Sequence, residues 1–391
     1  MIPYGQQQID DGDVEQVISV LRSSWLTQGP AVATFEQNVA NACGAAHAVA
    51  VCNATTALHL ACLALNIGPG DHVWTSPNTF VASANCARYC GAQLDFVDID
   101  PLSLNMSPTA LATKLAQAER QGRLPKLIIP VHFAGQPCDM AEISGLARQY
   151  GCWLIEDAAH AIGASYRGHR IGSGHYADMT VFSFHPVKII TTGEGGMVLT
   201  PNARLAARLS RLRNHGITRE PKEMEQTDAG AWYYEQLELG LNARMTDLQA
   251  ALGSSQLTRL AAFVQRRQQI AETYTEELAA LTQRPELGLV CPQTAADRRS
   301  AWHLYPVRVR ATERRRIFDH LRAAGIGVQI HYIPVHLQPY YRRLGFKAGD
   351  FPEAERYYQE TISLPIFPGL SEAQQATVLK VFKDALTCSS A

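Results

Sequence analysis

The chain has 391 residues, of which 46% are hydrophobic, and 35 Lys and Arg residues nearly balance 36 Asp and Glu residues. This length and composition allow a large buried core and two or three domains. The balanced charge argues against a nucleic-acid-binding surface, because phosphate binding needs a concentrated positive footprint. We therefore expect the partner to be a small molecule and not a nucleic acid.

The chain start shows no basic segment followed by an apolar run, so we expect no signal peptide. No stretch reaches the ~20 apolar residues that a transmembrane helix requires, and no membrane contact is expected. The nine cysteines form no Cys-x-x-Cys pair, which argues against a zinc site or a disulfide framework. The sequence thus predicts buried free thiols in a reducing cytoplasm and no bound metal.

Short apolar runs alternate with amphipathic stretches over roughly the first 250 residues, which is typical of strand–helix–strand units around a mostly parallel sheet. The runs expected to form strands are residues 48–51, 72–75, 94–97, 127–131, 153–155, 179–182 and 196–199. Helical spacing occurs between them, for example at residues 140–149 and 203–213.

The pattern changes after Met245, where residues 247–274 have the spacing of one long helical region that a break could divide. The elements expected beyond it are a strand at 303–309, a helix at 313–324, a strand at 327–330 and a helix at 372–386. The sequence therefore predicts a large α/β domain over residues 1–255 and a smaller C-terminal α+β domain over residues 256–391.

The first segment that could contribute to a binding site is residues 51–56, VCNATT, where a strand turns abruptly into a helix. Free N–H groups and the positive dipole end make a helix start a suitable place for an anion such as a cofactor phosphate. Thr55 and Thr56 would lie in the first turn, although threonine is also an ordinary N-cap. Further on, Phe80 follows a strand and could stack on a heteroaromatic ring, or could simply belong to the core.

Residues 153–160, WLIEDAAH, bring two acids to the carboxyl end of an apolar strand, where open α/β sheets place their ligands. A carboxylate there can keep a pyridinium nitrogen protonated, and the protonated ring withdraws electrons from a carbanion. An acidic pair is equally common at a helix N-cap, and the pattern leaves Glu156 as an alternative to Asp157. His160 could pack against the ring or satisfy a hydrogen bond in the core.

Residues 183–196, SFHPVKIITTGEGG, lie between two predicted strands. A lysine in such a polar, glycine-rich turn can approach a cofactor aldehyde and form an imine, and burial would lower its pKa and free the amine. The hydroxyls of Ser183, Thr191 and Thr192 and the flexible glycines favour this role for Lys188 over that of a solvated loop lysine.

Residues 239–247, LGLNARMTD, precede the long helical region. Asn242 and Arg244 would point out of the subunit from a loop immediately before that helix. The alternative is that they cap it.

Together these segments resemble the DegT-type nucleotide-sugar aminotransferases, which use pyridoxal 5'-phosphate (PLP) and have PLP fold type I, the aspartate aminotransferase-like class. The resemblance extends from residues 2–5, IPYG, to residues 363–366, SLPI, and so covers almost the whole chain. It implies a large domain with a seven-stranded, mostly parallel sheet, a smaller C-terminal α+β domain, and a homodimer with shared active sites.

The resemblance also implies roles for single residues around the cofactor ring. Lys188 matches the Schiff-base lysine, and Asp157 matches the partner of the pyridine nitrogen. Phe80 matches the aromatic that stacks on the ring. His160 occupies the position beside the ring where many relatives have Gln.

Other matched residues concern the cofactor phosphate. Thr55 and Ser183 match phosphate ligands, and Thr56 lies in the same turn. Asn242 matches the asparagine that reaches the phosphate from the opposite subunit. Ala54 departs from the glycine of many relatives, which puts a close phosphate contact from that backbone amide in doubt.

The sugar pocket is matched less specifically, by segments whose residues could also be packing residues. The candidates for substrate binding are Tyr4, Thr27, Gln28, His185, His331 and Tyr332.

A narrower resemblance connects the chain to the C4 aminotransferases of pseudaminic acid biosynthesis. The segments that carry it are residues 26–30, 53–65, 82–86 and 130–140. It implies transfer of an amino group from L-glutamate to C4 of a UDP-linked 4-keto-6-deoxy-N-acetyl-hexosamine, giving UDP-4-amino-4,6-dideoxy-N-acetyl-β-L-altrosamine. Nothing in the residue chemistry itself selects a stereoisomer.

Three alternatives stay open. One is an aminotransferase for another nucleotide-linked keto-sugar, such as C3 or C4 of a dTDP-sugar. A second is a PLP-dependent sugar 3-dehydratase, in which a histidine replaces the Schiff-base lysine, so Lys188 argues against it. The third is a non-enzymatic regulatory protein, which the neutral charge and the presence of Lys188 and Asp157 disfavour.

Overall fold

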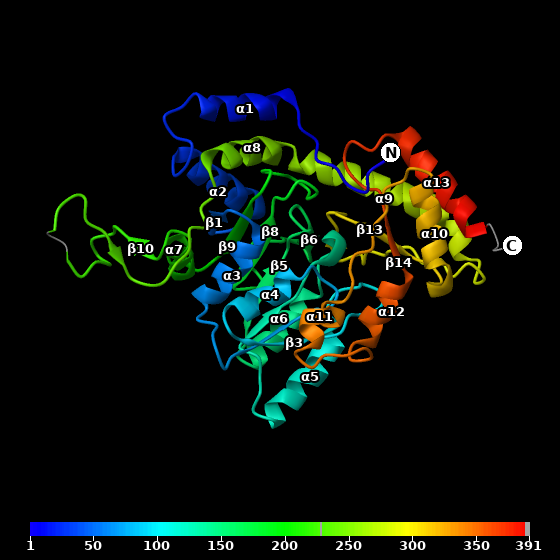
Figure 1. Ribbon diagram of the computed structural model, residues 1–391, viewed down its shortest axis with the longest axis horizontal. Helices are drawn as coiled ribbons and strands as arrows, with labels where there is room; N and C mark the ends of the chain where they lie inside the picture. Colours follow the sequence, from blue (N-terminus) through cyan, green and yellow to red (C-terminus); the bar gives the residue numbers. More distant parts are fainter. Residues whose placement is uncertain (227–228, 388–391) are drawn as a thin grey trace.

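The computed structural model describes residues 1–226 and 229–387. Its centre is a seven-stranded sheet (Figure 1). In their order across the sheet, the strands are β1 (His47–Val51), β9 (Gly196–Thr200), β8 (Met179–Ser183), β5 (Trp153–Asp157), β4 (Leu127–Ile129), β2 (His72–Thr75) and β3 (Gln93–Phe96). All neighbours pair in parallel except β9, which is antiparallel to both β1 and β8. The predicted α/β class and seven-stranded, mostly parallel sheet are confirmed.

Helices bury both faces of this sheet. One face is covered by α2 (Pro30–Cys43), α5 (Pro108–Arg120) and α6 (Met140–Gln149), and the other by α3 (Ala54–Ala64), α4 (Ala82–Tyr89) and α7 (Ala203–Leu212). Successive strand residues point to opposite faces, so Ile128 and Phe182 join the first core while Ile129 and Val181 join the second. Burial on both faces explains why the strands read as continuous apolar runs.

The long helical region predicted after Met245 is two helices, α8 (Asp247–Thr258) and α9 (Leu260–Thr282). The break lies at Arg259, whose guanidinium forms ion pairs with Asp10, at 2.6 Å, and with Asp13. These acids belong to the N-cap and first turn of α1 (Asp11–Leu21), which packs on α8. The ion pairs therefore fasten the N-terminal helix to the end of α8.

The C-terminal part has its own apolar core. Its larger elements are β13 (Tyr305–Arg308) and β14 (Thr361–Leu364), which pair antiparallel, and the helices α10 (Ala311–Ala323), α12 (Pro352–Glu360) and α13 (Glu372–Thr387). Helix α9 contributes Ile270, Tyr274 and Leu278 to this core. The division of the chain into domains near residue 255 remains our proposal.

The prediction of a strand at residues 327–330 is wrong. Gln329 makes only one isolated bridge, to Ser363 in β14. Gly327 instead donates its N–H to the carbonyl of Ile2 at 2.6 Å. The N-terminal segment therefore takes the hydrogen bonds that a continuous ladder would use.

The remaining elements are small. They are η1 (Phe133–Gly135), η2 (Val335–Leu337), α11 (Pro339–Arg342), a sheet of β12 (Arg298–Arg299), β6 (Ser165–Tyr166) and β7 (His169–Arg170), and the pair β10 (Ile217–Thr218) and β11 (Glu235–Gln236). The β10–β11 pair lies in an arm that projects from the body, at the left of Figure 1. We call residues 217–226 and 229–240 the arm.

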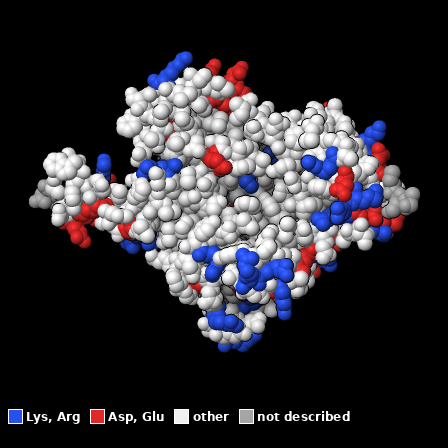
Figure 2. Space-filling view, in the orientation of Figure 1, with Lys and Arg blue, Asp and Glu red and all other residues white. Residues whose placement is uncertain are grey.

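The charged side chains do not form one continuous patch on the face shown in Figure 2, where acidic and basic groups are interspersed. Within the described residues, no helix is both long enough and apolar enough to cross a bilayer.

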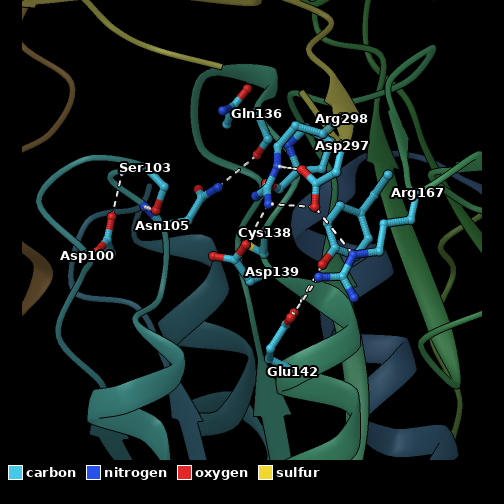
Figure 3. A network of polar contacts seen from close by, with 12 residues as sticks. Asp100, Ser103, Asn105, Gln136, Cys138, Asp139, Glu142, Arg167, Asp297 and Arg298 are labelled. Atoms are coloured by element: carbon cyan, nitrogen blue, oxygen red, sulfur yellow. Dashed lines mark hydrogen bonds and ion pairs between the residues drawn. The ribbon is translucent and has the colours of Figure 1, made fainter. Parts of the chain in front are cut away.

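An ion-pair network ties β12 to the start of α6 (Figure 3). The Arg298 side chain is only 5% exposed and pairs with Asp139 at 2.6 Å and with Asp297 at 2.8 Å. Arg167 extends the network, because it pairs with Asp297 at 3.3 Å and with Glu142 at 2.8 Å. Segments far apart in the sequence are thereby joined at one side of the sheet.

Replacing Arg298 with alanine should destabilise the protein, because the partly buried Asp139 loses its cation and Asp297 keeps only Arg167. We expect the Arg298→Ala variant to lose about 2 kcal/mol of unfolding free energy, measured by urea titration. The control is Arg315→Ala, whose side chain is 92% exposed and pairs with Asp319 on the surface of α10. That variant should change by less than about 0.5 kcal/mol. Equal losses in both variants would contradict the structural role of the network.

Candidate active site

Asp157 stands at the carboxyl end of β5, where its side chain is buried at 5% exposure. The Ser83 hydroxyl of α4 donates to its Oδ2 at 2.5 Å, and the N–H of Ala159 donates to its Oδ1 at 3.1 Å. Ser83 also lies 2.7 Å from the hydroxyl of Thr79. Ser83 was not predicted from the sequence, because a lone serine in a helix carries no signal.

Glu156 faces the opposite side of the strand, as the pleat requires. Its carboxylate accepts a hydrogen bond from the Thr180 hydroxyl at 2.6 Å and lies 3.6 Å from Nε2 of His132. Both partners are buried. Glu156 is therefore engaged within the core, and Asp157 is the acid that faces the candidate site.

Lys188 lies in the loop between β8 and β9, which is closed by hydrogen bonds between Phe184 and Gly195 and between Thr192 and Phe184, at 2.9 and 3.0 Å. Burial lowers the pKa of Lys188 to about 8, although the nearby Asp157 carboxylate acts to raise it. The amine therefore loses its proton far more easily than an ordinary lysine, which favours a role as a nucleophile or general base.

Three histidines surround Lys188. Burial, followed by the charge of Lys188, lowers the pKa of His331 to about 4 and that of His160 well below its ordinary range. Burial, followed by the neighbouring His160, does the same to the pKa of His303, whose ring centroid lies 4.3 Å from that of His160. All three imidazoles are therefore neutral at pH 7. His303 was missed by the sequence analysis, because no motif marks it.

Aromatic side chains complete this group. The Tyr332 hydroxyl lies 3.3 Å from Nε2 of His160. The ring of Tyr332 lies 6.2 Å from that of the exposed Phe80, and Tyr4 lies 5.5 Å from His331. The structure thus brings these five sequence-predicted residues into one group, of which His160 and His331 lie near Lys188.

The start of α3 lies at the same edge of the sheet. Its N-cap is Asn53, whose side chain accepts the N–H of Thr56 at 2.8 Å, so the threonine hydroxyls are not used as caps. Gly196 pairs with Ser183 and lies against the α3 start, because a Cβ placed on it would be 2.6 Å from the nitrogen of Ala54. The predicted phosphate-binding residues 54–56 and Ser183 therefore converge on one place.

The other predicted site residues are exposed and lie outside this group. Thr27 bridges to Thr246, and Gln28 lines a separate cavity of about 250 Å³ together with Arg244. Asn242 pairs with Asn214, which also lines that cavity. The remaining candidate, His185, is exposed and accepts the N–H of Lys188 at its carbonyl, 2.9 Å away.

Known proteins resemble the chain over nearly its whole length. The model of the DegT/DnrJ/EryC1/StrS aminotransferase family matches residues 7–383. The spore coat polysaccharide biosynthesis protein SpsC of Bacillus subtilis is 40% identical over 389 residues, covering 98% of this chain and 96% of that protein. The UDP-4-amino-4-deoxy-L-arabinose–oxoglutarate aminotransferase of Shewanella sediminis is 36% identical over 381 residues, covering 95% and 94%.

Solved structures agree. PseC of Helicobacter pylori, an aminotransferase of pseudaminic acid biosynthesis, superposes with a TM-score of 0.88 at 28% identity, covering 98% of this chain and 99% of that one. A Streptococcus pneumoniae protein named as a sugar aminotransferase, in its PMP form, gives a TM-score of 0.89 at 29% identity and covers 99% of both chains. The predicted family resemblance and PLP fold type I are confirmed.

The matched family is PLP-dependent, so the predicted cofactor is confirmed as well. The residues present fit PLP. A deprotonatable amine, Lys188, and a buried carboxylate, Asp157, belong to one group, and a helix start suited to a phosphate lies at the same sheet edge. Within the described part of the chain, the buried Nδ1 of His160 has no hydrogen-bond partner and remains free for a ligand.

A side chain at position 196 should disturb the phosphate end of this site. In Gly196→Ala the new Cβ would lie 2.5 to 2.7 Å from backbone atoms of Asn53 and Ala54, which forces the start of α3 to move. We expect PLP affinity to fall about tenfold or more, measured by fluorescence titration of the cofactor-free protein. Gly145→Ala is the control, because its Cβ would meet nothing within 4 Å. Unchanged affinity in Gly196→Ala would contradict a phosphate site there.

Proposed function

We propose that this chain, which belongs to the DegT/DnrJ/EryC1/StrS aminotransferase family, transfers an amino group from L-glutamate to C4 of a UDP-linked 4-keto-6-deoxy-N-acetyl-hexosamine. Its general activity, PLP-dependent transamination of a nucleotide-linked sugar, follows from that membership. The sugar, the C4 position and the donor are the proposal. The product is UDP-4-amino-4,6-dideoxy-N-acetyl-β-L-altrosamine, with 2-oxoglutarate released.

The observation that carries the proposal is the neutral, hydrogen-bonding surroundings of Lys188. His160, His303 and His331 are uncharged at pH 7, and Tyr332 adds a hydroxyl. Such groups can hydrogen-bond to the hydroxyls and the amide of a pyranose ring. The names of two relatives add support, since one acts on a UDP-linked 4-amino sugar and the other works in pseudaminic acid biosynthesis.

Within the site, Lys188 acts as the proton carrier. The lowered pKa leaves its Nζ able to bind the cofactor covalently and, once displaced, to take a proton from the glutamate Cα. In the second half-reaction, the protonated Nζ would donate a proton to C4 of the sugar. PLP, when bound, supplies the electron sink that makes these protons labile.

The other residues bind and orient the cofactor and the substrate. Asp157, fixed by Ser83, is placed to bind a protonated ring nitrogen. Phe80 and His160 would hold the ring of bound PLP, Phe80 by stacking. The start of α3, with Thr55 and its neighbours, binds the phosphate together with Ser183. Tyr4, His185, His331 and Tyr332 contact the sugar nucleotide.

A homodimer with shared active sites is part of the proposal. Asn242, Thr27 and Gln28 are exposed and lie apart from the Lys188 group, as expected of residues that contribute to the site of another subunit. The arm supports this assembly, because its Trp232 and Leu239 are 78% and 86% exposed and need an apolar partner. We place the enzyme in the cytoplasm, in keeping with its eight free cysteines among the described residues.

The two neighbouring acids should differ sharply in function. Asp157→Asn keeps the shape but removes the charge that faces the cofactor, so kcat should fall about 100-fold and PLP should dissociate more readily. Glu156→Gln is the matched control, because its contacts lie in the core, and it should keep near-normal kcat with some loss of stability. Steady-state kinetics and dialysis against buffer measure both effects. A lower kcat in Glu156→Gln than in Asp157→Asn would instead indicate that Glu156 is the acid that faces the cofactor.

The function itself is tested with purified holoenzyme. L-Glutamate alone should remove the visible absorbance of the lysine-bound cofactor, and the true keto-sugar should restore it while an amino sugar forms. The panel contains the UDP-linked 4-keto-6-deoxy-N-acetyl-hexosamine, a UDP-linked 4-keto-pentose and a dTDP-linked 3-keto-sugar. We expect the first to restore the absorbance with the highest kcat/KM.

Lys188→Ala is the control for this experiment and should lower turnover about 1,000-fold or more. If another sugar of the panel restores the absorbance, the proposed substrate is wrong but the aminotransferase activity is still supported. A deoxygenated product without an amino group would instead indicate a dehydratase. No response to glutamate and no cofactor absorbance would contradict the proposed function altogether.

A further inference from the structure

Three cysteines meet between α3 and α4, and none of them takes part in the proposed mechanism. Cys62 lies on α3, Cys86 on α4, and Cys90 caps the end of α4. The two helices pack against each other, and the three residues belong to one apolar cluster. Cys86 and Cys90 are one helical turn apart, so they lie on the same face, toward Cys62.

His59 lies one turn before Cys62 on α3, and its ring is 5.4 Å from that of Tyr89, the last residue of α4. Cys62 and Cys86 are fully buried, whereas Cys90 is half-buried and can be reached from solvent. The cluster therefore has one accessible thiol with a buried thiol and an imidazole beside it.

The thiols differ in acidity. Hydrogen bonding to Cys62, reinforced by His59, lowers the pKa of Cys90 to about 6 although burial opposes it. Hydrogen bonding to Cys86 and Cys90, together with burial, raises the pKa of Cys62 well above its usual range. At pH 7 the pair thus holds one nucleophilic thiolate and one protonated thiol.

A metal site is the other chemistry that cysteines and a histidine can offer. No group of three or more such side chains in the described parts of the chain has an arrangement that could hold a metal ion. The cluster is therefore better suited to thiol chemistry than to metal binding.

We propose that Cys90 is a peroxide-reactive thiol that forms a disulfide with Cys62. The Cys90 thiolate attacks one oxygen of hydrogen peroxide, the O–O bond breaks, and a sulfenic acid and hydroxide result. The sulfur of Cys62 then attacks the Cys90 sulfur, the S–O bond breaks, and its oxygen leaves as water with the thiol proton. The thiolate and the thiol are together oxidised by two electrons, and one peroxide is reduced to one water and one hydroxide, which takes a proton from solvent to become a second water.

This disulfide would link two helices that both carry cofactor-site residues. Helix α3 begins with the phosphate-binding residues 54–56. Helix α4 carries Ser83, which binds Asp157 and whose carbonyl accepts a hydrogen bond from Cys86 at 3.2 Å. The modification site thus lies on the two helices that carry these residues. It requires no particular sugar substrate, so it stands independently of the proposed function.

The first test maps alkylation of the holoenzyme by iodoacetamide, site by site, with mass spectrometry. At pH 7 Cys90 should react about 100-fold faster than Cys152, a half-buried cysteine whose pKa burial raises to about 11. The Cys90 rate should fall as the pH drops below about 6, because the thiolate becomes protonated. Equal rates at Cys90 and Cys152 would overturn the proposal.

The second test treats the holoenzyme with hydrogen peroxide and maps disulfides without reduction. A peptide pair joining Cys62 to Cys90, removed by dithiothreitol, is the expected result. Cys90→Ser should abolish it, Cys152→Ser should leave it intact, and Cys62→Ser should let dimedone trap Cys90 as a sulfenic acid. Wild-type protein that instead joins Cys90 to Cys86, or forms no disulfide while Cys152 oxidises first, would overturn the proposal without any variant having to fold.

Discussion

The hydrogen bond from Ser83 to Asp157 is the contact on which the candidate site depends. Removing a carboxylate from water is costly unless other groups replace the lost hydration. Asp157 is almost fully buried, so α4 must supply a hydroxyl and the following turn must supply the N–H of Ala159. This requirement fixes α4 against the end of β5, and with it the position of Phe80 just before that helix.

The cost of burying a charge also determines the protonation of Lys188. Burial lowers its pKa more strongly than Asp157 raises it, so the amine becomes available without becoming permanently neutral. The adjacent imidazoles could have upset this balance if they were protonated, because three more positive charges would repel the ammonium. Their own burial keeps the imidazoles neutral, so Asp157 is the main charge that acts on the pKa of Lys188. The reactive amine therefore has polar but uncharged imidazoles near it.

Much of the fold was predictable from the sequence because burial on both sheet faces leaves a plain apolar signature in each strand. The site was only partly predictable. The choice between Glu156 and Asp157 depends on the pleat of β5, and His303 and Ser83 reach the site from distant segments without a motif. The strand expected at residues 327–330 failed because its partner hydrogen bonds go to the chain's N-terminus. The roles of Thr27, Gln28 and Asn242 depend on a second subunit and remain proposals.

The antiparallel direction of β9 has a consequence for how the chain folds. Because β8 and β9 are neighbours in both sequence and space, the loop with Lys188 is closed by a local pairing that ends at Ser183 and Gly196. Closing a short loop costs little chain entropy, whereas the parallel pairs must wait for long crossovers to be ordered. The segment that carries the reactive lysine is therefore a low-contact-order hairpin, able to form early and to serve as a template on which the slower parallel strands assemble.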